Sequence, residues 1–115
     1  MESNLIHTID ASELGIQVAT FKTQGYRLVQ ISVLVIPEAF EVTYSFDHHL
    51  SLQHLRILIP KQAAQLQSIT PFYAGAFTYE NEIQDLFGVT LVGLQLDFHG
   101  HFYQLSQPTP FVPPA

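Results

Sequence analysis

The sequence predicts an α+β domain of two layers, in which helices cover a largely antiparallel or mixed sheet. Three observations support this class. Residues 40–46 alternate apolar and polar side chains, as a strand does when one face is buried and the other is wet. Residues 27–36 are rich in valine and isoleucine and lie between Gly25 and Pro37. Residues 14–21 carry apolar side chains at helical spacing. The predicted order is a helix, a three-strand meander, two helices and one or two further strands.

The first predicted helix opens at Asp10, which forms a capping-box pattern with Glu13 three residues later. It should end at Gly25, because glycine readily adopts the left-handed conformation that stops a helix. Three strands follow, and short turns join them. Short connections favour an antiparallel meander. The three strands are expected over residues 27–36, 40–46 and 50–59.

Two more helices are predicted in the second half of the chain. Pro60 suits the first position of a helix, because the N–H that it lacks would be unsatisfied there. Residues 61–69 contain good helix formers, glutamine, alanine and leucine. Another helix is expected over residues 79–87, closed by Gly88. Short strands are expected over residues 89–94 and 96–105.

The chain is expected to form one domain over residues 1–105, followed by an extended tail over residues 106–115. The tail holds four of the seven prolines, and proline neither continues a helix nor donates a hydrogen bond within a sheet. Two interpretations of the tail stay open. It lies along a partner, or it is a frayed terminus.

Composition excludes several classes of function. The 115 residues carry a net charge of −6 with only four lysines and arginines, so no basic stripe is present for nucleic acid or an anionic membrane surface. No cysteine occurs, which excludes thiolate ligation of an iron–sulfur cluster, disulfides and thiol chemistry. The absence of disulfides fits a cytoplasmic protein. No apolar run approaches the length of a membrane helix.

The low charge of the chain points to a covered surface. Charged residues make up 12%, about half of the usual quarter. This composition favours a subunit that meets other proteins, or a homo-oligomer. The glycines form no dinucleotide fingerprint and no serine lies in a nucleophile elbow, so neither nicotinamide or flavin binding nor serine hydrolysis is indicated.

Residues 78–88 hold three of the ten acidic residues, Glu80, Glu82 and Asp85. In a helix that begins at Tyr79, the two glutamates would lie in the first turn, where the helix dipole stabilises a carboxylate by roughly 0.3–1 kcal/mol. Asp85 would lie in the last turn, where the dipole disfavours it, and three residues from the like charge of Glu82. Either solvent tolerates this placement, or a cation or backbone donor from outside the helix compensates it.

Histidines provide two sets of candidate metal ligands. In a strand, Asp97, His99 and His101 would share one face at steps of about 6.6–7 Å, and two histidines with one carboxylate are a transition-metal ligand set. The alternative is a wet strand face, or a hairpin that turns at Gly100. The second set is His48, His49 and His54.

Residues 80–89, Glu-Asn-Glu-Ile-Gln-Asp-Leu-Phe-Gly-Val, resemble the central motif of the complex I 30 kDa subunit family of NADH dehydrogenases. That motif reads Glu-Arg-Glu, two residues, Asp, an apolar residue and Phe-Gly-Ile. Residues 96–103, Leu-Asp-Phe-His-Gly-His-Phe-Tyr, are similar to the Asp-Phe-x-Gly-x-x-Tyr ending of the small stand-alone versions. Those versions are small subunits of Ech-type energy-converting, membrane-bound nickel–iron hydrogenases. Asn81 replaces the usual arginine, and the arginine-rich extension of respiratory members is absent, which favours the compact hydrogenase type.

The resemblance implies a non-catalytic structural and assembly subunit of the hydrophilic arm of a membrane complex. Such a subunit docks against the large catalytic subunit and the iron–sulfur subunits, peripherally on the cytoplasmic side of the cell membrane. Those partners would carry the iron–sulfur clusters and the nickel–iron centre, and this chain would bind no cofactor. The implied interface candidates are Glu80, Glu82, Asp85, Leu86, Phe87 and Gly88.

Two alternatives stay open beside this interpretation. One is the equivalent subunit of an NADH- or ferredoxin-linked quinone oxidoreductase. The other is a small metal-dependent enzyme that uses Asp97, His99 and His101.

Overall fold

A computed structural model describes residues 3–93 of the chain. It confirms the predicted α+β class, with helices on a mixed sheet. In chain order the elements are β1 (Ser3–Thr8), the 3-10 helix η1 (Ala11–Glu13), α1 (Leu14–Thr23), β2 (Arg27–Ile36), β3 (Ala39–His48), β4 (Ser51–Pro60), the 3-10 helix η2 (Lys61–Ala63), β5 (Gln65–Gln67), α2 (Ala76–Phe87) and β6 (Thr90–Val92).

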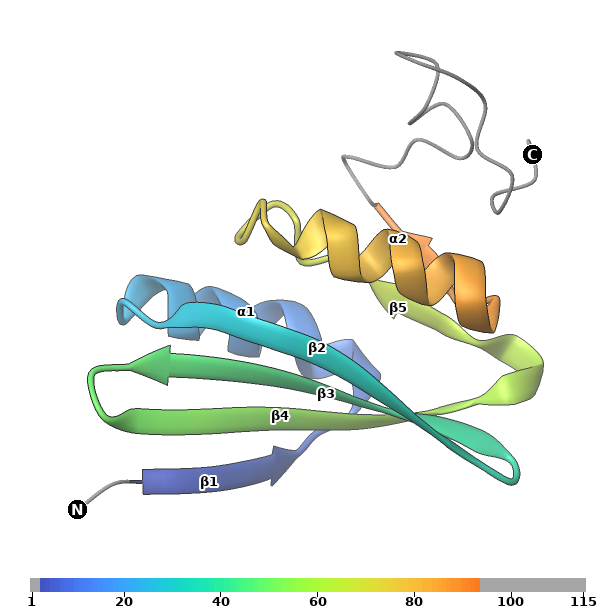
Figure 1. The fold of residues 1–115 in the computed structure, drawn as a ribbon, viewed down its shortest axis with the longest axis horizontal. Coiled ribbons are helices and arrows are strands. Elements are labelled where there is room, and N and C mark those ends of the chain that lie inside the picture. The colour runs from blue at the N-terminus through green and yellow to red at the C-terminus, as the bar shows by residue number, and fades with distance from the viewer. Residues whose placement is uncertain (1–2, 94–115) are drawn as a thin grey trace, which may run out of the picture.

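The main sheet has four strands in the order β1-β4-β3-β2 (Figure 1). Strands β2, β3 and β4 form the predicted antiparallel meander, with Tyr44 of β3 opposite both Ile31 and Leu55. Strand β1 joins parallel to β4, so the sheet is mixed. A separate pair of short parallel strands joins β5 to β6.

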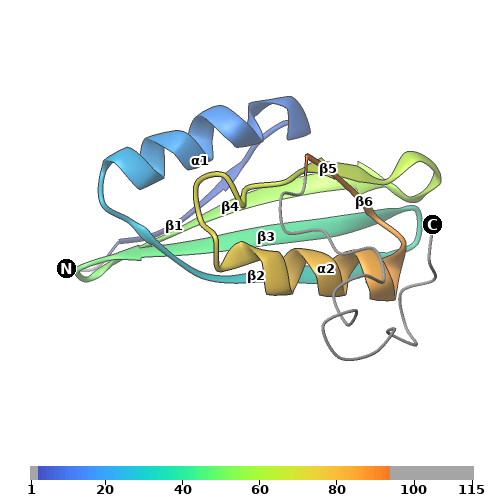
Figure 2. The same cartoon turned by 90° about the horizontal axis from the view of Figure 1, so that it is seen from above.

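Both helices cover the same face of the main sheet (Figures 1 and 2). The ring of Phe21 in α1 lies 4.8 Å from that of Phe46, and the ring of Phe87 in α2 lies 5.7 Å from that of Phe40. Phe40 and Phe46 belong to one alternation in β3 and therefore point to one face. The domain thus has two layers, and within residues 3–93 no helix covers the opposite face of the sheet.

The core follows the predicted periodicities. In the first helix the stripe at helical spacing is buried, and Asp10 caps η1, the 3-10 turn that leads into α1, by accepting a hydrogen bond from the Ser12 N–H at 3.0 Å. Gly25 follows the helix with φ of 89°, in the left-handed region that favours glycine. The buried apolar side chains of α1 and β3 are Leu14, Val18, Phe21, Phe40, Val42, Tyr44 and Phe46.

The helix predicted over residues 61–69 is wrong. A single 3-10 turn follows Pro60, and β5 then begins. Leu66 is buried between two exposed glutamines, which is the period of a strand. Its backbone partner, β6, lies much later in the chain, and this tertiary pairing overrides a local helix propensity that is worth only tenths of a kcal/mol per residue.

Other boundaries differ for physical reasons. Helix α2 begins at Ala76 instead of Tyr79, because the fully buried Ala76 extends the packed stripe by one turn. No strand is predicted before Asp10, yet β1 lies there. Its neighbouring apolar side chains Leu5 and Ile6 are both about half exposed at the sheet edge, so they give no alternation to detect.

The short strand predicted over residues 89–94 is confirmed as β6. The strand predicted over residues 96–105, and the boundary between the domain (1–105) and the tail (106–115), lie outside the described residues.

Two glycines give a matched test of this backbone. Gly88 ends α2 with φ of 71°, whereas Gly15 in α1 has no such conformation, and a Cβ atom would meet nothing within 4 Å at either site. We expect Gly88→Ala to lower the free energy of unfolding by about 1–2 kcal/mol, because the left-handed conformation is strained for alanine. Gly15→Ala should raise it by about 0.5–1 kcal/mol. Urea unfolding of the purified chain measures both. Shifts of the same sign would contradict the assigned helix end.

Candidate functional site

Helix α2, which carries the interface candidates, lies beside β2 and runs in the same direction (Figure 2). Near its start, the Tyr79 hydroxyl donates a hydrogen bond to the Val29 carbonyl at 3.1 Å. At its end, Phe87 packs against Phe40, which pairs with Val35 near the end of β2. The sheet therefore fixes both ends of α2.

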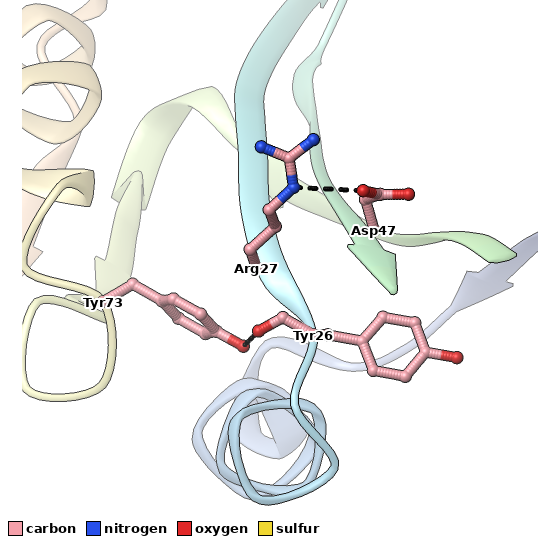
Figure 3. A network of polar contacts seen from close by, with 4 residues as sticks. All are labelled: Tyr26, Arg27, Asp47 and Tyr73. Carbon is pink, nitrogen blue, oxygen red and sulfur yellow. Dashed lines mark hydrogen bonds and ion pairs between the residues drawn. The ribbon is translucent and has the colours of Figure 1, made fainter. Parts of the chain in front are cut away.

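The loop that leads into α2 is anchored to the start of β2 (Figure 3). The Tyr73 hydroxyl donates to the Tyr26 carbonyl at 2.7 Å, and the Tyr73 ring lies 5.5 Å from that of Phe46. Arg27, which follows Tyr26 in the chain, forms an ion pair through Nε with Asp47 at 3.0 Å. Because Arg27 is largely exposed, this ion pair contributes little energy, and the buried tyrosine contact does more to hold the loop.

Glu80 is fully buried beneath α2. Its carboxylate accepts hydrogen bonds from the Ser68 hydroxyl at 2.6 Å and from the Ile69 N–H at 2.8 Å. Ser68 Oγ in turn accepts the Thr70 N–H at 3.1 Å. The carboxylate is thus satisfied and enclosed by its own chain. It offers no surface to another polypeptide, in contrast to its expected role as an interface residue.

The acidic residues also sit differently along the helix. Because α2 begins at Ala76, no acidic residue lies in its first turn, and the predicted dipole stabilisation of Glu80 and Glu82 does not apply. Asp85 lies in the last turn, as predicted, and that turn holds no basic residue.

Burial raises the pKa of Glu80, and its two hydrogen bonds oppose that rise. The phenol of Tyr44 is also fully buried, and burial together with the nearby Glu80 charge raises its pKa. Within residues 3–93 the Tyr44 hydroxyl has no hydrogen-bond partner. Tyr44, Ser68 and Glu80 are thus three buried polar side chains beneath α2, while Ala76 and Ile83 of the same helix belong to the apolar core.

Apart from Phe87, which packs on the sheet, the other candidates lie on the outer part of α2. Glu82 is exposed, Leu86 is 65% exposed, and Gly88 ends the helix. Asp85 is half-buried, and this burial raises the pKa of its carboxyl group. In the described part of the chain neither Glu82 nor Asp85 forms an ion pair. The cation that would compensate Asp85 is therefore not supplied by residues 3–93.

Asn81, which stands where the resembled motif has arginine, bonds within its own helix. Its Nδ2 donates to the Phe77 carbonyl one turn earlier at 2.8 Å. This side chain therefore does not take the outward role of a long cationic residue.

Histidine placement gives no metal site in the described part of the chain. The rings of His48 and His49 lie 4.2 Å apart, but His54 bonds the Ser45 hydroxyl through Nδ1 at 2.8 Å. Residues 3–93 contain no group of three metal-ligating side chains. The other candidate ligands, Asp97, His99 and His101, lie outside the described residues. In the same range, no helix is long and apolar enough to cross a membrane.

Comparison with known families and structures connects this fold to respiratory complexes. The family model described as respiratory-chain NADH dehydrogenase, 30 Kd subunit, matches residues 8–98. No curated protein matches the chain.

The solved structures that share the fold include the following two. A chain of the membrane-bound sulfane sulfur reductase, an archaeal respiratory membrane complex, aligns with a TM-score of 0.74 at 20% identity. The alignment covers 83% of this chain and 61% of that one, so this chain spans about three fifths of that relative. A trypsin-resistant fragment of Nqo5 aligns with a TM-score of 0.68 at 24% identity, covering 76% of this chain and 78% of the fragment. At these identities the likeness concerns the fold.

Glu80→Ala tests the buried carboxylate. The variant leaves the Ile69 N–H without an acceptor and removes the carboxylate that the Ser68 hydroxyl bonds, and an unsatisfied buried group costs about 1–3 kcal/mol. We expect the free energy of unfolding to fall by about 2 kcal/mol or more, measured by urea unfolding. Glu82→Ala, an exposed change on the same helix, should stay within about 0.5 kcal/mol. Similar small effects in both variants would show that Glu80 does not hold the fold.

The raised pKa of Glu80 predicts a pH dependence. Below the pKa of about 4.3 that glutamate has in an unfolded chain, the group is protonated in both states and its contribution to stability is fully present. As pH rises through the higher pKa of the folded state, that contribution is lost. Relative to Glu80→Gln, which does not titrate, the wild-type chain should therefore lose stability as pH rises across this interval. Urea unfolding at a series of pH values measures the difference in free energy of unfolding between the two chains. A difference that does not vary with pH would contradict the raised pKa of Glu80.

Proposed function

The chain belongs to the 30 Kd subunit family of the respiratory-chain NADH dehydrogenase, and from this membership we propose that it is a non-catalytic structural subunit of a membrane-bound energy-converting complex. In this role it docks against the large catalytic subunit and the iron–sulfur subunits of the hydrophilic arm. It lies peripherally on the cytoplasmic side of the membrane. The match over residues 8–98 is the observation that carries the proposal.

The chemistry of the chain supports a docking role. With no cysteine, these 115 residues cannot ligate an iron–sulfur cluster through thiolates, so clusters and any nickel–iron centre would belong to the partners. The exposed Leu86 and the carboxylates of Glu82 and Asp85 beside it form a surface that another polypeptide would complete. A basic group of the partner would compensate Asp85 at the unfavourable end of the helix.

Within the family we propose the Ech-type nickel–iron hydrogenase as the host complex. The support is the resemblance of residues 96–103 to the ending of the small stand-alone versions, together with Asn81 in place of arginine. The second candidate is the equivalent subunit of a quinone oxidoreductase. It is favoured by the description of the matching family and by the fold likeness to Nqo5.

Purification of the intact complex tests the function. The tagged full-length chain is expressed in its native host, membranes are solubilised, and the co-purifying proteins are identified by mass spectrometry. We expect a large subunit with paired Cys-x-x-Cys motifs, which ligate nickel and iron, and iron–sulfur subunits. A large subunit without those motifs would support the quinone oxidoreductase instead. Recovery of the chain without any large subunit would overturn the docking role.

Asp85→Lys tests the contact surface in the same purification. The change should raise the free energy of unfolding by a few tenths of a kcal/mol, because lysine suits the last turn of a helix. It should lower the ratio of large subunit to tagged chain by about tenfold, which corresponds to about 1.4 kcal/mol of binding. Glu13→Lys makes the same charge change at an exposed site before α1 and should leave the ratio unchanged. If Asp85→Lys raises both stability and recovery, Asp85 is only a tolerated surface residue.

A further inference from the structure

Strand β2 is an edge strand with an unusually apolar free side. Among residues 3–93 it pairs only with β3, so the backbone groups on its other side have no strand partner. Residues 28–36 contain no charge and no proline, and Leu34 and Val35 are 58% and 50% exposed. Soluble proteins usually protect such an edge with charges, prolines or a bulge, because it pairs readily with another chain.

The first part of this edge is protected. A register shift lies between Leu28 and Gln30, and the carbonyl between them, that of Val29, accepts the hydrogen bond from the Tyr79 hydroxyl. Neither the register shift nor this hydrogen bond extends beyond Gln30 along the strand. The free edge is therefore residues 30–36.

One flank of α2 overhangs this free edge. Tyr79, Glu82 and Leu86 are spaced by three and four residues, so they lie along one side of the helix. Tyr79 reaches the β2 backbone, which shows that this side faces β2. The opposite side faces β6, where Gln84 accepts a hydrogen bond from the Leu91 N–H at 3.2 Å.

Two exposed apolar side chains, one from β2 and one from α2, lie along this edge beside one carboxylate. Val35 pairs with the buried Phe40, so its side chain points to the face of the sheet that α2 covers. Leu86 is exposed on the overhanging flank, and Glu82 lies beside it without an ion pair in the described residues. An extended segment that pairs with residues 30–36 would run between Val35 and Leu86.

Charge decides which occupant fits. If two copies paired through their β2 edges, the two β2 strands would run antiparallel and a two-fold axis would pass through their middle. Glu82 lies close to that middle, between the Tyr79–Val29 contact and the Phe87–Phe40 contact. The two Glu82 carboxylates would then face each other across the axis, in two chains that each carry −6. A partner of opposite charge meets no such repulsion.

We propose that the free edge of β2 and the flanking side of α2 receive an extended segment of another subunit. This segment adds a strand to the sheet at residues 30–36, packs apolar side chains against Val35 and Leu86, and places a lysine or arginine beside Glu82. The inference rests on the proposed function, which it deepens by naming the docking mode.

Hydrogen exchange on the purified complex and on the isolated chain tests the pairing. Those amides of residues 30–36 that point away from β3 should exchange at least tenfold more slowly in the complex, because an added strand protects an edge. The exposed turn at residues 49–50 provides the internal control and should not change. Equal exchange of residues 30–36 in both samples would overturn the proposal. If these amides are already protected in the isolated chain and light scattering gives the mass of a dimer, the edge is occupied by a second copy instead.

Two edge variants provide a matched comparison. Val35→Asp and Ile6→Asp introduce the same charge at side chains that are 50% and 53% exposed, on the two opposite edge strands of one sheet. In the native-host purification, Val35→Asp should lower the recovered partner by about tenfold and Ile6→Asp should not. The reverse pattern would place the contact on β1 and overturn the proposal. Urea unfolding of each variant confirms that the fold persists.

Charge reversal tests the predicted cation. Glu82→Lys should also lower the recovered partner about tenfold, with unfolding unchanged, because residue 82 is exposed. If the complex assembles with both Val35→Asp and Glu82→Lys, the edge proposal fails while the docking function stands. If no other protein of the complex co-purifies with the wild-type chain, the function itself fails.

Discussion

The carboxylate of Glu80 ties together the second half of the fold. It joins α2 to the segment that follows β5, through the Ser68 hydroxyl and the Ile69 N–H. That segment is joined in turn to β6 by the hydrogen bond from the Ser68 N–H to the Val92 carbonyl, at 2.8 Å. Strands β5 and β6 are only three residues each and would not persist alone, so the buried carboxylate and the short sheet depend on each other. A charge enclosed in this way is costly unless all its bonds are made, which gives this region one well-defined arrangement.

This arrangement determines what α2 presents to its surroundings. Because Glu80 and Ile83 face inward, the side of the helix that carries Glu82 and Leu86 is directed toward the β2 edge. The anchoring of Tyr73 and Tyr79 to backbone carbonyls at the start of β2 sets the position of the helix along the strand. The fold therefore positions the helix that carries the proposed docking surface before a partner arrives, and such preorganisation lowers the entropic cost of association.

The sequence predicts the meander and the first helix well, because each has a period that local side chains reveal. The side chains of β3 alternate between apolar and polar over residues 40–46, and α1 carries its three buried side chains at helical spacing. The strand within residues 61–69 could be predicted only with knowledge of β6, because Leu66 lies in a strand as a result of its pairing with Leu91. Strand β1 depends likewise on β4.

In the candidate site, Glu82 and Leu86 are exposed and Asp85 is half-buried, whereas Glu80, which the sequence also offered as an interface residue, is fully buried. A signal was present, because residues 76, 80, 83 and 87 form one helical stripe in which Glu80 is the single polar member. A carboxylate at an apolar position indicates a buried acceptor, and Ser68 is the donor that no spacing rule would have located. The parallel pairing of β1 carries a last consequence, for the order of assembly. Strand β1 is synthesised before β4 but pairs with it, from Ser3 opposite Ser51 onward, so β1 must wait for the meander to form before it joins the sheet.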